Sequence, residues 1–587
     1  MGVNTKYKPF YQAVEIKDLK EMLNTSCNKY AEKPAFFVKD KESHEYVPIL
    51  YSQLKNDVDA LGTALINLDL KGKRIIIIGE NRYEWAVSYL AVVNGTGIVV
   101  PFDKELPENE IESLVKRSKA DAIIFSSKYE NVITKIADKN ENIKIRICMD
   151  SKEESKSFHT FRELITEGER LFKKGDNRFV NAEIDNEAMS IMLFTSGTTA
   201  TAKAVMLSHK NICTNIMDMT KMLYFDSHDT VFSFLPLNHT YECSCGFLTP
   251  IAKGLGIAYC EGLRHIGKNL KESKATIMLS VPLIIEAMYR KIWEQSAKKP
   301  GLVFKMKIAL AISNLLKFFG IDLSKKIFKE LHENFGGQLR LIISGAAGID
   351  PRVAKGFRDF GISFIQGYGL TECSPIIALN MDNYFRDAAA GLPMPSDEIK
   401  IEKSDSSKYG EITAKGPNIM LGYYENPEAT AEVIKDGWFY TGDLGYFDKK
   451  GFLYITGRKK DLIVTKNGKN IFPEELEMIL NRSPLIKESM IYGKVDNEGD
   501  TVICATIVIN KEFINQKFGD EASEELIKSL INKEVRVVNK KLPLYKHIRE
   551  YNLREEELKK TTTNKIKRYL EMASEMASKF INNGHHN

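Results

Sequence analysis

Residues 195–203 combine hydroxyl side chains, a glycine and a lysine in a short stretch that follows an apolar run. Hydroxyl groups, backbone N–H groups and an ammonium are donors that proteins use to hold phosphate oxygens. The candidate phosphate-binding residues are Thr195, Ser196, Gly197, Thr198, Thr199 and Lys203. The sequence therefore predicts a phosphate-binding loop, with an ordinary serine- and threonine-rich surface loop as the alternative.

This loop differs from the P-loop of nucleoside triphosphatases. That motif requires a second glycine directly before its lysine and a hydroxyl residue directly after it. Lys203 lies instead between Ala202 and Ala204. The pattern argues against a nucleoside triphosphatase.

A second group of candidates lies in residues 367–375, Gly-Tyr-Gly-Leu-Thr-Glu-Cys-Ser-Pro, which follow a predicted strand. The ring of Tyr368 can stack on a purine, and the hydroxyl of Thr371 can contact a phosphate. The carboxylate of Glu372 can hold Mg²⁺ against a polyphosphate. Alone, such a stretch is usually a plain loop, so its meaning depends on the other motifs of the chain.

The elements around these candidates are predicted as alternating strands and helices. A strand ends at residue 194, and Ser208 is placed to cap a helix that begins near residue 210. Residues 74–78, 83–93 and 98–100 are predicted as strand, helix and strand. The alternation predicts an α/β fold of mostly parallel sheets covered by helices, with ligands at the carboxyl ends of the strands.

Taken together, these stretches resemble the signature motifs of the adenylate-forming superfamily of acyl-CoA synthetases, peptide-synthetase adenylation domains and firefly-type luciferases. The phosphate loop resembles Thr-Ser-Gly-Thr-Thr-Gly-x-Pro-Lys-Gly, with Ala200, Ala202 and Ala204 in place of Gly, Pro and Gly. Residues 368–372 match Tyr-Gly-x-Thr-Glu. Further matches are residues 344–348, 440–445, 457–461 and 561–568, so the resemblance covers essentially the whole chain.

The resemblance implies a nucleotide site. Gly345 and Ala346 are expected beside the adenine and the substrate carboxylate, with Tyr368 and Gly369 close by. Asp443 is expected to receive the ribose hydroxyls. Arg458 is expected near the ribose and the α-phosphate, and Lys460 is expected at a hinge. Thr198 and Glu372 are expected to bind Mg²⁺.

It also implies where the chemistry on the acid takes place. Lys565 corresponds to the lysine that bridges the substrate carboxylate and the α-phosphate, with Lys567 as the alternative. Residues 236–242 resemble the segment that supplies a histidine beside the acyl pocket, here His239. Gly468 belongs to a loop that approaches the pantetheine arm of coenzyme A.

The pattern is most similar to bacterial long-chain fatty-acid–CoA ligases. It implies ATP-dependent activation of a medium- to long-chain fatty acid to acyl-AMP, then thioesterification to coenzyme A, with ATP and Mg²⁺. Two alternatives stay open: an acyl-AMP ligase that loads a separate carrier protein, and a non-catalytic nucleotide-binding protein. We expect a large AMP-binding domain over residues 1–458 and a smaller, mobile α+β domain over residues 459–587, with the hinge near Lys460.

The composition of the chain limits the classes of partner that are expected. The net charge is +5 on 587 residues, so no nucleic-acid partner is implied. The eight cysteines lack a disulfide framework, and a cytoplasmic protein is expected. Residues 302–321 are predicted as an amphipathic helix in which Phe304, Ile308, Ala311 and Leu315 share a face. We expect that face to be buried in the protein itself; the alternative is peripheral contact with the inner face of a membrane.

Overall fold

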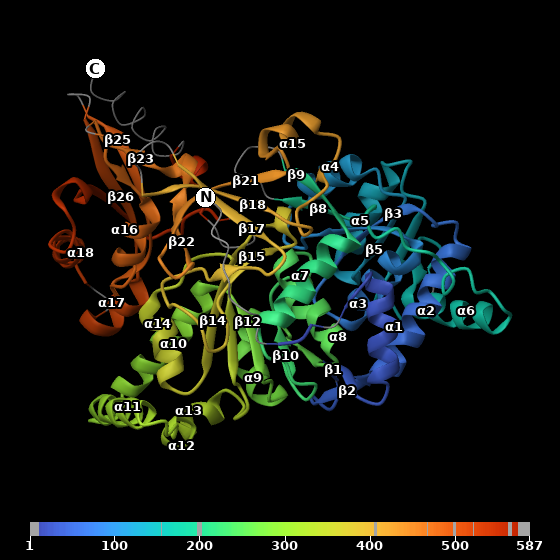
Figure 1. Cartoon of the computed structure of the whole chain (residues 1–587), viewed down its shortest axis with the longest axis horizontal. Coiled ribbons are helices and arrows are strands. Elements are labelled where there is room, and N and C mark those ends of the chain that lie inside the picture. Colours follow the sequence, from blue (N-terminus) through green and yellow to red (C-terminus); the bar gives the residue numbers. More distant parts are fainter. Residues whose placement is uncertain are drawn as a thin grey trace.

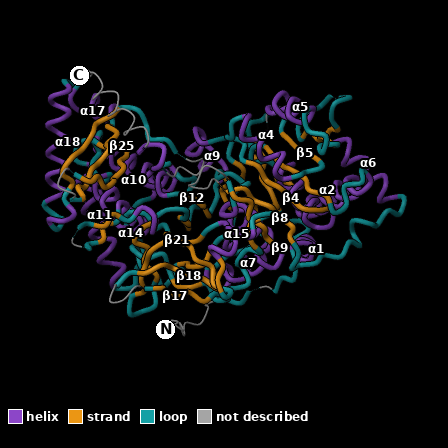
Figure 2. The backbone as a smooth tube through the Cα atoms, turned by 90° about the horizontal axis from the view of Figure 1, so that it is seen from above, coloured by secondary structure: helices purple, strands orange, loops and turns teal. Residues whose placement is uncertain are grey.

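The computed structural model describes residues 11–572 apart from residues 14, 41, 154, 196–201, 404–407, 467, 497–499, 520–521 and 561–565. Figure 1 shows the chain passing from its N-terminal elements at the right to its C-terminal elements at the left. Seen from above in Figure 2, helices α17 and α18 lie at one end of the molecule, and α5 and α6 lie at the other.

One large sheet is built around parallel strands of the N-terminal part. Its central strand β3 contains the run Ile75 to Ile78, whose side chains are fully buried, as expected for a strand covered on both faces. Strands β8, β9 and β19 pair antiparallel at one edge, and the others are parallel. The order is β19 (Gly422–Tyr423), β9 (Lys203–Ser208), β8 (Met189–Thr195), β4 (Gly97–Phe102), β3 (Lys73–Ile78), β5 (Ala122–Phe125), β6 (Ile145–Cys148) and β7 (His159–Thr160).

A second large sheet lies beside it. Strands β14, β13, β12, β10, β11 and β1 are parallel, and β2, β15 and β16 add antiparallel edges. The order is β16 (Leu392–Pro393), β15 (Ile376–Leu379), β14 (Ser363–Gly369), β13 (Leu341–Ser344), β12 (Ile277–Ser280), β10 (Thr230–Ser233), β11 (Gly256–Tyr259), β1 (Pro34–Lys39) and β2 (Tyr46–Leu50).

Helices cover these sheets. They are α1 (Leu19–Lys29), α2 (Tyr51–Asn67), α3 (Tyr83–Ala91), α4 (Glu108–Ser118), α5 (Glu130–Asp138), α6 (Phe161–Lys173), α7 (His209–Met222), α8 (Thr249–Lys253), α9 (Ile266–Ser273), α10 (Pro282–Ala297), α11 (Leu302–Phe318), α12 (Ser324–Ile327), α13 (Lys329–Asn334) and α14 (Pro351–Asp359). The α/β fold class is confirmed. So is the predicted cap at Ser208, which caps α7 through a reciprocal capping box with Asn211; Asp350 caps α14.

A smaller antiparallel sheet follows, formed by β17 (Glu398–Glu402), β18 (Gly410–Lys415), β20 (Ile434–Lys435), β21 (Trp438–Phe447) and β22 (Leu453–Arg458), with α15 (Pro427–Val433) beside it. The C-terminal part contains β23 (Ile463–Val464), β24 (Asn470–Ile471), α16 (Pro473–Leu480), β25 (Ile486–Val495), β26 (Thr501–Ile509), α17 (Lys511–Phe518), α18 (Glu524–Asn539) and β27 (Ile548–Arg554). Its buried apolar residues, from Ile463 to Ile548, pack in a cluster of their own. The domain division at residues 458 and 459 stays a prediction.

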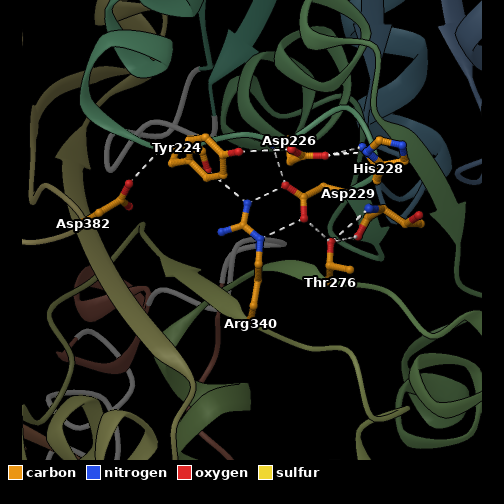
Figure 3. A network of polar contacts seen from close by, with 8 residues as sticks. Tyr224, Asp226, His228, Asp229, Thr276, Arg340 and Asp382 are labelled. Carbon is orange, nitrogen blue, oxygen red and sulfur yellow. Dashed lines mark hydrogen bonds and ion pairs between the residues drawn. The ribbon is translucent and has the colours of Figure 1, made fainter. Parts of the chain in front are cut away.

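A charged network ties together the amino ends of three parallel strands of the second sheet (Figure 3). Asp229 precedes β10, Thr276 precedes β12 and Arg340 precedes β13. Arg340 Nε donates to Asp229 Oδ1 over 2.8 Å, and the Thr276 hydroxyl donates to the same oxygen over 2.7 Å. The network lies at the amino ends of these strands. Ligands in such folds bind at the carboxyl ends, which the network does not occupy.

Helix α11 corrects one prediction. Phe304, Ile308, Ala311 and Leu315 do share a face, but that face is exposed to solvent and not buried in the protein. The buried residue of α11 is Ser313, on the opposite side of the helix. The sequence pattern identified the stripe, whereas only the packing of α11 on its neighbours decided which side is covered.

Candidate functional site

A cleft of about 1720 Å³ lies along the carboxyl ends of the parallel strands and the C-terminal part of the chain. The segment after β13 and the segment from the end of β14 onward both line it, as expected for this fold class. Residues of β21, β22 and α16 line it from the other side. Candidates separated by hundreds of positions in the sequence therefore meet in one cavity.

Tyr368, Asp443 and Arg458 form the polar centre of this cleft. The Tyr368 hydroxyl donates to Asp443 Oδ2 over 2.5 Å, and Arg458 Nε lies 2.8 Å from Asp443 Oδ1. Asp443 and Arg458 are register partners across the β21–β22 hairpin, so the backbone itself brings the two charges together. Burial and the neighbouring Asp443 raise the pKa of Tyr368 well above its usual range, so its hydroxyl is a donor at neutral pH. The arrangement offers an aromatic ring, an acceptor and a fixed cation to one ligand.

Tyr423 joins two other candidates. Its hydroxyl donates to Glu372 Oε1 over 2.9 Å, and Lys203 Nζ lies 4.7 Å from the centre of its ring. Strand β19 places Tyr423 beside β9, which begins at Lys203. The hydroxyl of Tyr423 thus contacts a carboxylate and its ring contacts an ammonium, at the point where the phosphate loop ends and β9 begins.

Only the ends of the phosphate loop belong to the described residues. Thr195 closes β8, and its hydroxyl donates to the Lys203 carbonyl over 3.3 Å. Ser196, Gly197, Thr198 and Thr199 lie outside the described residues. Ala204, one of the three departures from the family motif, pairs with Phe194 in extended β structure, so that position needs no glycine.

Close neighbours or an unusual backbone conformation constrain three of the candidates, Gly345, Ala346 and Gly369. A Cβ on Gly369 would lie 1.8 Å from the Pro375 carbonyl oxygen, so no side chain fits there. A Cβ on Gly345 would lie 3.0 Å from the ring of Tyr241. Ala346 has φ +70°, a left-handed conformation that costs a non-glycine residue energy. Ala346 lines the cleft, so the strained backbone turns toward the ligand side.

His239 also lines the cleft. Its Nε2 lies 3.5 Å from Asp103 Oδ2, and Asp103 is a buried residue directly after β4. Four residues along, Cys243 donates its backbone N–H to the His239 carbonyl over 2.9 Å. The imidazole therefore lies beside a buried carboxylate at the edge of the cleft, a position that suits a pocket wall.

The C-terminal candidates divide into two groups. Lys460 lines the cleft, and burial lowers the pKa of its ammonium. Lys567 and Arg568 line it too, with Arg568 2.7 Å from Glu477. Lys565 lies outside the described residues. Gly468, at φ +69° in the turn between β23 and β24, is not among the described residues that line the cleft.

Sequence reasoning missed Tyr423, Asp103 and Glu474. Tyr423 belongs to a two-residue strand, and Asp103 follows a buried strand without any motif around it, so neither carried a local signal. Glu474 lines the cleft, and burial raises its pKa to about 7. Within the described part of the chain, no group of three or more metal-ligating side chains is present.

Comparison with known proteins agrees with this geometry. A family model described as AMP-binding enzyme matches residues 23–424, and one described as AMP-binding enzyme C-terminal domain matches residues 460–576. The chain belongs to the AMP-binding enzyme family. Tyr368 lies within the first matched range, whereas Asp443 and Arg458 lie in the interval between the two ranges.

Two curated relatives and one solved structure show how far the likeness extends. Long-chain-fatty-acid–CoA ligase 1 of Cavia porcellus is 30% identical over 77% of this AMP-binding enzyme and 69% of its own length. The chloroplastic long-chain-fatty-acid–[acyl-carrier-protein] ligase AEE15 of Arabidopsis thaliana is 26% identical over 89% of this chain and 80% of its own length. The crystal structure of the anthranilate CoA ligase AuaEII with anthranoyl-AMP covers 96% of this chain and 98% of its own, at 20% identity and a TM-score of 0.76, which supports the fold.

Proposed function

We propose that this AMP-binding enzyme is an acid–thiol ligase that activates a medium- to long-chain fatty acid with ATP and then transfers the acyl group to coenzyme A. The observation that carries the proposal is the Tyr368–Asp443–Arg458 arrangement in a cleft that also holds Lys203, Glu372 and His239. The relatives named as fatty-acid ligases support the choice of acid.

In the first step, a fatty carboxylate attacks the α-phosphorus of ATP and pyrophosphate leaves. Tyr368 stacks on the adenine, and Asp443 accepts hydrogen bonds from the ribose hydroxyls while Arg458 holds its carboxylate in place. The phosphate loop with Lys203 holds the β- and γ-phosphates. Lys565 neutralises the charge that develops on the carboxylate and the α-phosphate, which is worth more in the transition state than in the ground state.

Mg²⁺, held by Glu372 and Thr198, would neutralise the polyphosphate charge. The Tyr423 hydroxyl orients the Glu372 carboxylate for this role, because one oxygen is occupied by the hydrogen bond and the other remains for the ion. His239 forms the wall on the acyl side, positioned by Asp103.

In the second step, the thiol of coenzyme A displaces AMP from the acyl-adenylate. We propose that the C-terminal part rotates about Lys460 between the steps and brings the Gly468 turn toward the cleft, since that turn lies outside it here. A carrier protein in place of coenzyme A is the second candidate acceptor, favoured by the relative named as an acyl-carrier-protein ligase.

A membrane surface is the further partner that we propose, because long-chain fatty acids partition into bilayers and α11 exposes an apolar face. Among the described residues, no helix has the length and hydropathy to cross a membrane. The contact that we propose is a peripheral one.

One assay tests the proposal. Pyrophosphate and AMP release are measured with a panel of acids, each with coenzyme A, with an acyl carrier protein, or with neither acceptor. We expect pyrophosphate release with fatty acids and AMP release that depends on coenzyme A. AMP release only with the carrier protein would favour the second acceptor, and no pyrophosphate with any acid would favour a non-catalytic nucleotide-binding protein.

A further inference from the structure

Helix α11 presents a large apolar face to solvent. Phe304, Ile308, Ile312, Leu315 and Phe318, spaced three or four residues apart, lie on one side of the helix and are 44–83% exposed. We call these five residues the α11 face. Phe319 and Ile321 extend it beyond the end of the helix, at 68% and 50% exposure. Contiguous patches of this kind mark interaction surfaces on soluble proteins.

The opposite side of α11 attaches the helix to the protein. Ser313 is buried, the Ser296 hydroxyl contacts Met306 Sδ over 3.0 Å, and Lys317 Nζ donates to the Arg358 carbonyl over 2.8 Å. Figure 1 shows α11 and α12 at the lower edge of the molecule, next to α10 and α14. The helix is thus fixed with its apolar side outward.

The charge around this face is concentrated to an unusual degree. Residues 298–333 contain eight lysines, one aspartate and two glutamates, a net charge of +5, which equals the net charge of the whole chain. The remainder of the chain therefore carries no net charge. The lysines are Lys298, Lys299, Lys305, Lys307, Lys317, Lys325, Lys326 and Lys329. All except Lys317 are exposed.

Lys305 and Lys307 flank the apolar residues along α11. Neither forms an ion pair with another described residue, in contrast to Lys317, which is directed toward Asp322 at 3.8 Å. An apolar stripe between exposed lysines is the pattern of a helix that lies in the plane of a bilayer interface, with its apolar side chains among the acyl chains and its cations near the headgroups.

We propose that the α11 face docks on an anionic lipid surface, with Lys305 and Lys307 at the headgroups. A second copy of this chain is the less favourable occupant, because pairing two such faces would bring two net charges of +5 together. An acidic lipid surface satisfies both the apolar residues and the lysines.

The docking surface lies next to the cleft. Helix α10 packs against α11 and lines the cleft with Leu283, Tyr289 and Trp293, and with the charged residues Glu286, Arg290 and Glu294. A fatty acid that leaves the bilayer beneath α11 would therefore meet α10 before it reaches His239. This delivery role rests on the proposed function, whereas the docking itself does not.

Vesicle flotation of the full chain tests the docking. The vesicles contain phosphatidylcholine alone or with 30 mol% phosphatidylglycerol. We expect binding to the anionic vesicles, weakening as salt is raised. Phe304→Ser with Phe318→Ser should weaken binding at least about tenfold, because each exposed phenylalanine loses its burial in lipid. Lys305→Glu with Lys307→Glu should also weaken vesicle binding at least about tenfold, because each lysine near an anionic surface contributes about fivefold in affinity.

Matched controls use exposed residues elsewhere. Leu263→Ser with Val495→Ser removes two apolar side chains of 64% and 68% exposure, and Lys540→Glu with Lys541→Glu repeats the charge change on the C-terminal part. Both control variants should bind vesicles as the wild type does. Equal binding by the wild type and the α11 variants, or no binding to anionic vesicles, would overturn the proposal; so would a wild-type dimer that the α11 variants dissociate.

A second measurement separates docking from catalysis. With a short, water-soluble fatty acid and no vesicles, the α11 variants should keep wild-type turnover. With a long-chain acid supplied in anionic vesicles, their turnover should fall with their vesicle binding. Vesicle binding without turnover on any acid would overturn the proposed function and leave the docking in place.

Discussion

Asp443 and Arg458 face each other across the β21–β22 hairpin, and Arg458 Nε lies 2.8 Å from Asp443 Oδ1. The family resemblance assigned both residues to the ribose, but it treated them as separate contacts. The ion pair makes them one unit, because the guanidinium fixes the orientation of the carboxylate.

Asp443→Asn should therefore weaken ATP binding. The amide keeps the volume but loses the charge that accepts from Tyr368 and holds Arg458, and a hydrogen bond to a charged group is worth about 1.5–3 kcal/mol. We expect the Kd for ATP–Mg²⁺ to rise about 10- to 100-fold by calorimetric titration. The exposed Asp436→Asn serves as the control and should bind ATP normally. Unchanged affinity in Asp443→Asn would remove the ribose assignment.

Tyr423→Phe should raise the Mg²⁺ concentration needed for pyrophosphate release. The variant keeps the ring beside Lys203 but loses the hydroxyl that donates to Glu372. One such hydrogen bond is worth about 1 kcal/mol, about fivefold. The matched control is Tyr424→Phe. The Arg74 guanidinium lies over the ring of Tyr424, and this tyrosine is not among the residues that line the cleft. If both variants need the same Mg²⁺ as the wild type, Glu372 is not positioned by Tyr423.

Lys565→Ala should slow the first half-reaction far more than the second. Its charge is needed only while the mixed anhydride forms, so we expect a loss of about 10²-fold or more in pyrophosphate release. Thioester formation from preformed acyl-AMP should change little. Lys567→Ala decides between the two candidate lysines: if it shows the larger loss, Lys567 carries the role.

Lys460→Pro tests the proposed hinge. Proline fixes φ near −65°. If φ of residue 460 changes during the rotation, proline at this position prevents the change. We expect pyrophosphate release to persist while coenzyme A turnover is lost. Lys460→Ala removes the same ammonium but leaves φ free, and should retain coenzyme A turnover. Normal thioester formation by the proline variant would place the hinge elsewhere.

Glu242→Gln should change how stability depends on pH. Glu242 is buried and accepts from the Ser233 hydroxyl over 2.5 Å, and burial raises its pKa to about 8. The folded protein therefore keeps a proton that the unfolded chain, with an ordinary carboxyl pKa near 4.5, has already lost. In that window the wild type loses stability as pH rises, by roughly 1.4 kcal/mol per unit.

We accordingly expect the melting temperature of the wild type to fall between about pH 5 and pH 8 relative to that of Glu242→Gln, whose amide does not titrate. Differential scanning fluorimetry across this range measures the difference. The exposed Glu512→Gln is the control and should follow the wild type. Parallel curves for wild type and Glu242→Gln would show that the carboxyl is ionised throughout.

The sequence by itself predicted the fold class and the local elements. The isoleucine run of β3 and the cap at Ser208 depend on neighbours within a few positions, so their residue types were enough. The motifs around Tyr368, Asp443 and Arg458 were found for the same reason. An aromatic ring, a carboxylate and a guanidinium have the same chemical properties whatever structure surrounds them.

Only the tertiary structure decided which residues meet. Tyr423 joins Lys203 to Glu372 across more than 150 positions, and Asp103 meets His239 across more than 130, with no local pattern to show it. The α11 face is the clearest case. A helical stripe has the same spacing whether it packs inward or faces solvent, and the side that is covered depends on the elements packed against it, because burial is a property of the assembled layers and not of the helix.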